Sequence, residues 1–192
     1  LVDGRQLNKY FSSGAPLRKI NRSYIACPVL TSHAHHPKYI FLVGPNRGRL
    51  IVGSGNLSIS GYAGPGECFV VHEWSVNSDT DSLQPFLSLK EMIFDQIDLG
   101  LIDRITASRV RDIFDAGKWI NGDLTDNSIV IHNSKQSLID QFAARVNGRA
   151  VIEIIASAPF HDQSAKAVDA LLTEFKPLKF SLLVQNKVTR LN

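Results

Sequence analysis

A strand–helix–strand pattern near the C-terminal end of the sequence constrains the fold more than any other feature. Residues 151–156 form an apolar run, residues 163–175 have the apolar spacing of a helix, and residues 180–184 form a second apolar run. Two strands joined through a helix usually pair in parallel, because a parallel pair needs a long crossover connection. The chain is therefore predicted to be α/β, with a parallel component in its sheet.

The first half of the chain adds short strands and then helices. Residues 39–43 and 50–52 are rich in β-branched and aromatic side chains, which indicates two short buried strands around a turn-rich loop at 44–49. Further strands are expected at 23–30 and 67–76. From about residue 82 to 119 the apolar period becomes helical, with a break at 98–100, and another helix is expected at 134–146, with Asn133 or Ser134 as its cap.

Polar residues with chemical potential flank the two short strands. His36 and Lys38 stand just ahead of the first strand, and Ser54 and Asn56 follow the second in a glycine-rich turn. If the two strands pair as neighbours, an imidazole, an ammonium, a hydroxyl and a carboxamide reach a common end. Such a set provides one nucleophile or base, one fixed charge and neutral donors for an anionic phosphoryl group.

These residues form an H-x-K motif followed one strand later by G-S-x-N, and in this the chain resembles the phospholipase D superfamily. The matching positions are His36, Lys38, Gly53, Ser54 and Asn56, with Ser58, Gly61 and Glu67 in suitable places. The family usually has an Asp five residues after the Lys, where this chain has Val43. That departure, and the position of Asn56 eighteen residues after Lys38, are more similar to the tyrosyl-DNA phosphodiesterase and restriction-nuclease branches.

The resemblance implies a phospholipase D-like mixed sheet flanked by helices, in a pseudo-dimer of two repeats. Residues 1–120 would be the first repeat, with part of its N-terminal side missing, residues 121–148 a connecting loop and helix, and residues 149–192 the start of the second repeat. A weak echo between residues 1–8 and 183–192 agrees with this division. The chain is therefore expected to be a piece of a larger protein.

The resemblance also implies a mechanism through a phosphohistidine. His36 would attack phosphorus or protonate the leaving oxygen, Lys38 and Asn56 would hold non-bridging oxygens, and Glu67 would orient a histidine. The family needs neither metal nor cofactor, and two H-x-K motifs share one site. Since this sequence has one such motif, the second half-site would come from missing chain or from a homodimer partner.

DNA is the expected substrate, and the chain is expected to be a nuclease-like module that hydrolyses phosphodiester bonds. Ser54 and Ser58, and the loop arginines Arg47 and Arg49, are the candidate substrate-binding residues. One alternative is a phospholipid phosphodiesterase or phosphatidyltransferase. Another is a degenerate, non-catalytic nucleic-acid-binding module, which the presence of Val43 and of Pro65-Gly66 just before Glu67 would favour.

Charge and hydropathy indicate the cellular location of the protein but do not identify a substrate. The net charge of +3 is too small to indicate nucleic-acid binding by itself. No apolar run reaches the ~18 residues of a membrane span, and no signal peptide is recognisable, so we expect a cytoplasmic protein without membrane contact.

Other residues that often carry chemistry have simpler explanations. Cys27 and Cys68 lie in apolar surroundings and are predicted to be buried free thiols. The cluster of His33, His35 and His36 suggests a metal site, but Lys38 beside it disfavours a cation. Two tryptophans, Trp74 and Trp119, are expected to pack in the core rather than to stack on bases.

Overall fold

The computed structural model describes residues 1–14, 19, 26–32, 35–64, 66–125, 130–158, 162 and 164–184 of the 192-residue chain. The chain divides into two compact units, Leu1–Val130 and Ile131–Asn192. Small β-sheets and six α-helices make up the described residues, so the protein is mixed α/β, as predicted. None of the described helices is both long and apolar enough to cross a membrane.

The first unit is built on a three-stranded antiparallel sheet in the order β3-β4-β5. The strands are β3 (Tyr39–Val43), β4 (Arg47–Gly53) and β5 (Phe69–Ser75), so all three predicted strands are present. β4 starts earlier than expected, which makes the prediction of loop positions for Arg47 and Arg49 wrong. Backbone pairing of Gly48 with Val43 and of Arg49 with Leu42 extends the strand into the expected loop.

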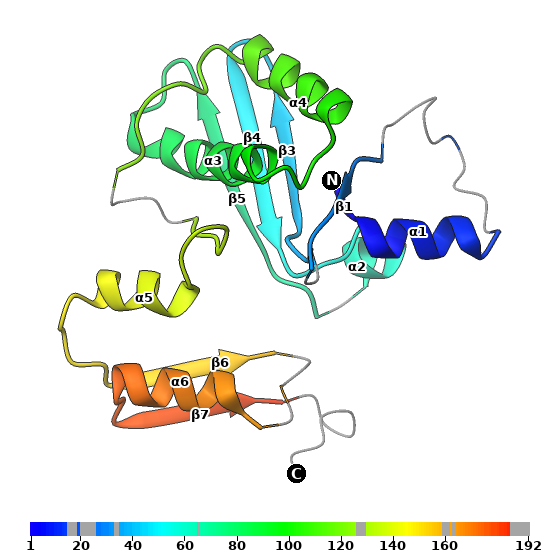
Figure 1. Ribbon diagram of the computed structural model, residues 1–192. Helices are drawn as coiled ribbons and strands as arrows, with labels where there is room; N and C mark the ends of the chain where they lie inside the picture. Colours follow the sequence, from blue (N-terminus) through cyan, green and yellow to red (C-terminus); the bar gives the residue numbers. More distant parts are fainter. Residues whose placement is uncertain are drawn as a thin grey trace. The chain divides into compact units, whose positions relative to one another are not determined.

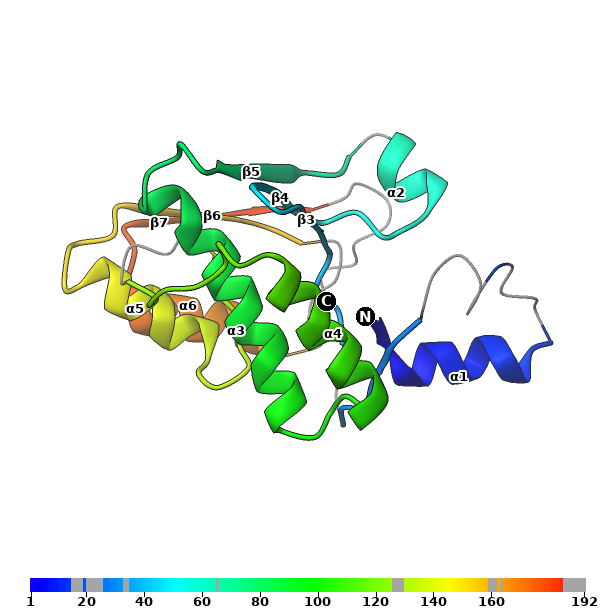
Figure 2. The ribbon, with the colours of Figure 1, turned by 90° about the horizontal axis from the view of Figure 1, so that it is seen from above.

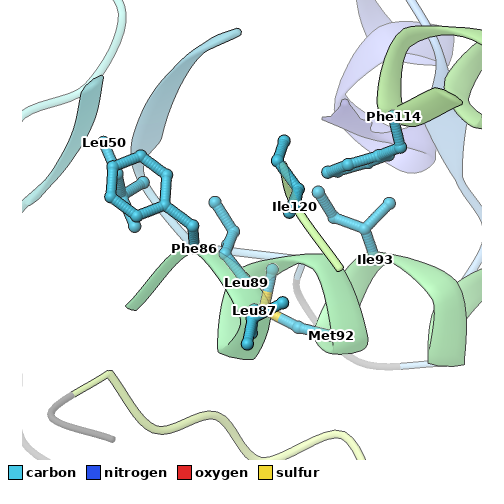
Figure 3. Close-up of a cluster of buried hydrophobic side chains, with 8 residues drawn as sticks. All are labelled: Leu50, Phe86, Leu87, Leu89, Met92, Ile93, Phe114 and Ile120. Carbon is cyan, nitrogen blue, oxygen red and sulfur yellow. The ribbon is translucent and has the colours of Figure 1, made fainter. Parts of the chain in front are cut away.

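Two helices, α3 (Gln84–Asp98) and α4 (Arg104–Ala116), cover one face of this sheet (Figures 1 and 2). Alternation along the strands sends Tyr39, Phe41, Leu50 and Val52 toward the helices. The resulting core holds eight buried side chains (Figure 3): Leu50, Phe86, Leu87, Leu89, Met92, Ile93, Phe114 and Ile120. Removal of this apolar surface from water is the main stabilisation of the first unit.

Both tryptophans belong to this core, as predicted. The rings of Trp74 and Trp119 stack with their centroids 4.2 Å apart. The indole Nε1 of Trp119 donates a hydrogen bond of 2.8 Å to the carbonyl of Gly44. A side chain at Gly48 would overlap the Trp119 ring, so glycine is required there for the ring to lie on β4. The two stacked tryptophans therefore hold the turn between β3 and β4 in place.

The N-terminal segment forms a second, smaller strand pair. β1 (Val2–Asp3) pairs in parallel with β2 (Pro28–Val29), and α1 (Gly4–Ser12) follows β1. The strand expected at 23–30 is thus found at its C-terminal end, whereas residues 23–25 lie outside the described part of the chain. Two short helices complete the first unit: α2 (Ile59–Ala63) and a 3₁₀ turn, η1 (Asp81–Leu83).

The prediction that the cysteines are buried is wrong, although both are free thiols. Cys27 is half-buried and Cys68 is exposed. Cys68 precedes the first residue of β5, beyond the part of the sheet that α3 and α4 cover. An apolar neighbourhood in sequence therefore does not bury a residue that lies at a strand end.

The second unit contains the predicted strand–helix–strand. β6 (Glu153–Ser157) and β7 (Lys179–Leu183) pair in parallel, and α6 (Lys166–Phe175) connects them. A further helix, α5 (Leu138–Val146), precedes them and is capped by Ser137, so the expected start at residue 134 was too early. Residues 185–192, which carry most of the C-terminal echo, lie outside the described residues.

Candidate functional site

The strand ladder brings the motif residues together at one end of the sheet. The amide of Gly53 donates to the carbonyl of Lys38 at 3.1 Å, and the amide of Ser54 donates to the carbonyl of Cys68 at 3.0 Å. Pairing therefore continues one step past the strand ends, across all three strands. Lys38, Ser54 and the chain around Glu67 become neighbours for this reason, as the sequence pattern predicts.

His36 and Lys38 contact each other directly. The ammonium of Lys38 lies 2.7 Å from Nδ1 of His36 and 3.2 Å from the His36 carbonyl oxygen. It also lies 3.2 Å from Nε2, and because an ammonium can only donate, whichever ring nitrogen is unprotonated accepts this hydrogen bond. Partial burial lowers the pKa of Lys38, and the nearby Glu67 carboxylate opposes that shift. The His36 side chain is exposed to solvent, with a cation beside it.

Ser54 connects the glycine-rich turn to Glu67. Its hydroxyl donates a 2.5 Å hydrogen bond to Oε2 of Glu67 and accepts one of 3.0 Å from the amide of Cys68. Glu67 was predicted to orient a histidine, but its hydrogen bond in the described residues goes to Ser54. Glu67 also acts on Lys38 through its charge. The carboxylate therefore interacts with both polar groups, through a hydrogen bond with the hydroxyl and through its charge with the ammonium.

The turn that carries Asn56 is held by backbone contacts. The amide of Ser58 donates to the carbonyl of Asn56 at 2.7 Å, and the Ser58 hydroxyl accepts from the amide of Gly61 at 3.1 Å. A Cβ atom at Gly61 would overlap the backbone of Asn56, and one at Gly55 would overlap the carbonyl of Gly61. Ser58 thus fixes the start of α2, and the Asn56 side chain is left exposed beside the strand ends.

Asp3 is a site-supporting residue that the sequence analysis missed. One carboxylate oxygen accepts from the amide of His35 at 2.8 Å, and the other accepts from the amides of Arg5 and Gln6 at 2.9 and 3.1 Å. The hydrogen bond from His35 is the largest cause of the lowered pKa of Asp3. An Asp ahead of a helix is a recognisable N-cap signal, but nothing local indicates its bond to residue 35.

His35 itself lies beside the site without being part of the motif. Burial is the main reason that its pKa is lowered, and its Nε2 has no hydrogen-bond partner among the described residues. His33, the third histidine of the cluster, falls outside those residues. Across the described ranges, no group of three or more metal-ligating side chains is found.

The two candidate arginines lie at the other end of β4. Arg47 pairs across the sheet with Ser75, six residues before Gly53, whereas Gly53 pairs with Phe69. A hollow of about 640 Å³ opens there. Its lining includes Leu42, Arg47, Arg49, Glu73, Trp74 and Ser78. Arg49 forms an ion pair with Glu73. The arginines are therefore separated from His36 by the length of a strand.

No family model, curated protein or solved structure matches this chain. Its function is inferred from its own residues and their contacts.

Proposed function

We propose that this chain is a metal-independent phosphodiesterase of the phospholipase D type, a nuclease-like module acting on DNA through a phosphohistidine. The observation that carries the proposal is the contact of 2.7 Å between the Lys38 ammonium and His36 Nδ1, at the strand end that also holds Ser54. A nucleophile beside a fixed cation suits attack on an anionic phosphodiester, because the cation offsets the charge of the phosphoryl oxygens.

The proposed reaction has two displacements. The Lys38 ammonium first moves from the unprotonated nitrogen of His36 to a non-bridging oxygen of the substrate, which frees the lone pair of that nitrogen. This nitrogen attacks phosphorus, a P–N bond forms, and the bond from phosphorus to the leaving oxygen breaks as an acid protonates that oxygen. Water then attacks phosphorus, loses its proton to the group that acted as acid, and breaks the P–N bond. His36 is regenerated, and the product is a phosphomonoester with an alcohol.

The neighbouring side chains have matching roles in this proposal. Lys38 neutralises a non-bridging oxygen, and the exposed carboxamide of Asn56 donates to another. Ser54 and Glu67 act as a unit, since their hydrogen bond of 2.5 Å fixes the carboxylate near the ammonium of Lys38. Ser58 fixes the turn that presents Asn56.

The acid that protonates the leaving oxygen belongs to a second H-x-K motif in this proposal. The two-repeat architecture of the phospholipase D type supplies it from chain outside this sequence, or a second copy of this chain supplies it. If a second copy supplies the acid, a mixture of His36→Ala and Lys38→Ala proteins would stay inactive, because each mixed dimer has a defect in both halves of its site.

Wild-type protein mixed with excess His36→Ala protein would lose more activity than the same wild-type protein diluted with buffer.

The test is hydrolysis of bis(p-nitrophenyl) phosphate in EDTA by the wild type and by His36→Ala. We expect the substitution to lower the rate by about 10³-fold or more, because the covalent route disappears. His72→Gln is the matched control, since His72 pairs with Leu50 in the middle of the sheet, away from the site. Equal losses in both variants, or a wild-type activity that EDTA removes, would refute the proposal.

A non-catalytic nucleic-acid-binding module is the second candidate, and Val43 favours it. The side chain of Val43 packs against the core at the end of β3 farthest from Lys38. The carboxylate that the family usually carries at this position therefore has no equivalent there. Salt-sensitive DNA binding by wild-type protein, without turnover in EDTA, would select this candidate.

A further inference from the structure

The face of the β3-β4-β5 sheet that points away from α3 and α4 has a distinct pattern of side chains. Since Tyr39, Phe41 and Leu50 face the helices, alternation assigns the intervening residues to the opposite side, here called the outer face. The side chains on this face are those of Lys38, Ile40, Leu42, Arg47, Arg49, Ile51, Phe69, Val71, Glu73 and Ser75. Cationic groups therefore occupy both ends of the outer face, and aliphatic groups occupy its middle.

The two cationic ends differ in their surroundings. Lys38 lies beside His36 at the proposed catalytic end. At the other end, Glu73 pairs with Arg49 and offsets its charge. Arg47 is exposed at the hollow and has no acidic partner among the described residues. Ser75 and Ser78 also line this hollow; their hydroxyls are hydrogen-bonded to each other at 3.3 Å, so one of the two can donate to an anion. The far end is thus suited to one phosphate.

The distance between the two cationic ends favours nucleic acid over a phospholipid as the bound phosphodiester. Six residues of β4 separate Arg47 from Gly53, which pairs with Lys38. At about 3.3 Å per residue the ends lie about 20 Å apart. A stacked nucleic-acid strand advances about 3.4 Å per nucleotide, so about six nucleotides cover this distance. A single phospholipid head group reaches only one end.

We infer that the outer face binds a single strand of nucleic acid, with a phosphate at Arg47 while the reacting phosphate lies at His36 and Lys38. The inference rests on the proposed function and adds a minimum length to its substrate. The exposed aliphatic middle supports a single strand: Leu42 and Val71 are 53% and 52% exposed. Unpaired bases can lie on such a surface, whereas the bases of a duplex are covered by their own stacking.

The test is fluorescence anisotropy in EDTA with labelled oligothymidylates of three and of twelve nucleotides. Arg47→Ala is expected to weaken binding of the 12-mer about tenfold, as loss of a charged hydrogen bond does, and to leave the 3-mer unchanged. The salt dependence of 12-mer binding should also become shallower. Arg104→Ala is the matched control, because it removes the same charge from an exposed position at the start of α4.

A second variant moves affinity in the opposite direction, which misfolding would not do. Glu73→Gln releases Arg49 from its ion pair, so the 12-mer should bind several-fold more tightly. Equal effects of Arg47→Ala and Arg104→Ala would overturn the inference, as would equal effects on the two lengths. Arg47-dependent binding to anionic phospholipid vesicles with no preference for the 12-mer would assign the face to a membrane surface instead.

These outcomes separate the inference from the proposed function. Arg47-dependent binding of the 12-mer without EDTA-resistant turnover would support the outer face and refute the enzyme. Turnover that requires His36 but does not depend on Arg47 or on oligonucleotide length would support the enzyme and refute the outer face.

Discussion

Lys38 is a residue at which the proposed chemistry conflicts with stability. Its ammonium is partly withdrawn from water, and burial lowers its pKa from the usual value of 10.5. The folded state therefore binds the lysine proton less tightly than the unfolded state does. Below its folded pKa, the charged lysine destabilises the fold, and this cost decreases as pH rises toward 10.5. In the proposed reaction, the cation beside His36 offsets the charge of the phosphoryl oxygens in spite of this cost.

Replacing this lysine should separate the two effects. Lys38→Met is expected to raise the free energy of unfolding at neutral pH while abolishing activity, because the apolar side chain has no charge to desolvate. Urea denaturation from pH 7 to pH 10.5 should show this gain shrinking as pH rises. Lys9→Met, at an exposed position of α1, should show no such trend. A Lys38→Met protein that is less stable at pH 7 would contradict the account.

Single residues also show how far sequence reasoning extends. The meeting of Lys38 and Ser54 was predictable, because both flank strands that a short turn must pair. The bond from Asp3 to His35 was not, since it joins residues 32 positions apart through a side chain and a backbone amide. The hydrogen bond of Glu67 to Ser54 was also missed, since the sequence does not show which donor a carboxylate reaches in the fold.

At the scale of elements, the turn between β4 and α2 decides the position of Asn56. Gly55 and Gly61 approach each other so closely that their backbones are in contact, and no Cβ atom fits at either position. The turn is therefore held by close packing of its backbone rather than by a large side chain. Small residues in this segment have a structural reason that is independent of catalysis.

Gly61→Ala should consequently disturb the turn. We expect a loss of about 2 kcal/mol in unfolding free energy, typical of overpacking, together with reduced phosphodiesterase activity. Gly44→Ala is the comparison, because its Cβ would lie 3.3 Å from the carbonyl of Arg47, a milder contact. Thermal denaturation and the chromogenic assay would measure both effects. Equal stability in the two variants would show that the turn can relax.

The presence of each strand was easier to predict from the sequence than the residues at which it begins and ends. The runs at 39–43 and 67–76 predicted β3 and all of β5, because their side chains suit a pleated, half-buried surface. β4 extended beyond its prediction because Gly48 and two arginines read as a loop. Cross-strand partners, the Arg49–Glu73 ion pair among them, make these residues a strand, and single-sequence propensity contains no information about partners.

The whole molecule shows a strong contrast in burial between its two units. The fully buried hydrophobic residues of the described chain all belong to Leu1–Val130, whereas no described residue of the second unit is fully buried. The β6-α6-β7 motif has the expected local structure, yet Ile155 and Leu178 are 65% and 87% exposed. A unit this small with so little buried apolar surface is marginal in stability.

Amide hydrogen exchange should show that the second unit opens at a lower free energy than the first. Amides of β4 are expected to exchange only on global unfolding of the first unit, whereas those of β6 and β7 should exchange through local opening at lower free energy. Mass spectrometry of exchanged peptides in native buffer would measure it. Equal protection in β4 and β6 would mean that the second unit is buried by a partner, such as another copy of the chain.

Asp3 connects the N-terminal segment of the chain to the segment that carries His36. One carboxylate joins the first strand, the first turn of α1 and the residue next to His36, so an N-terminal position acts on the site from 33 residues away in sequence. A mutational survey that is restricted to the H-x-K and G-S-x-N segments would therefore not include Asp3. A library intended to alter the chemistry of His36 should therefore include the N-terminal strand as well as the motif itself.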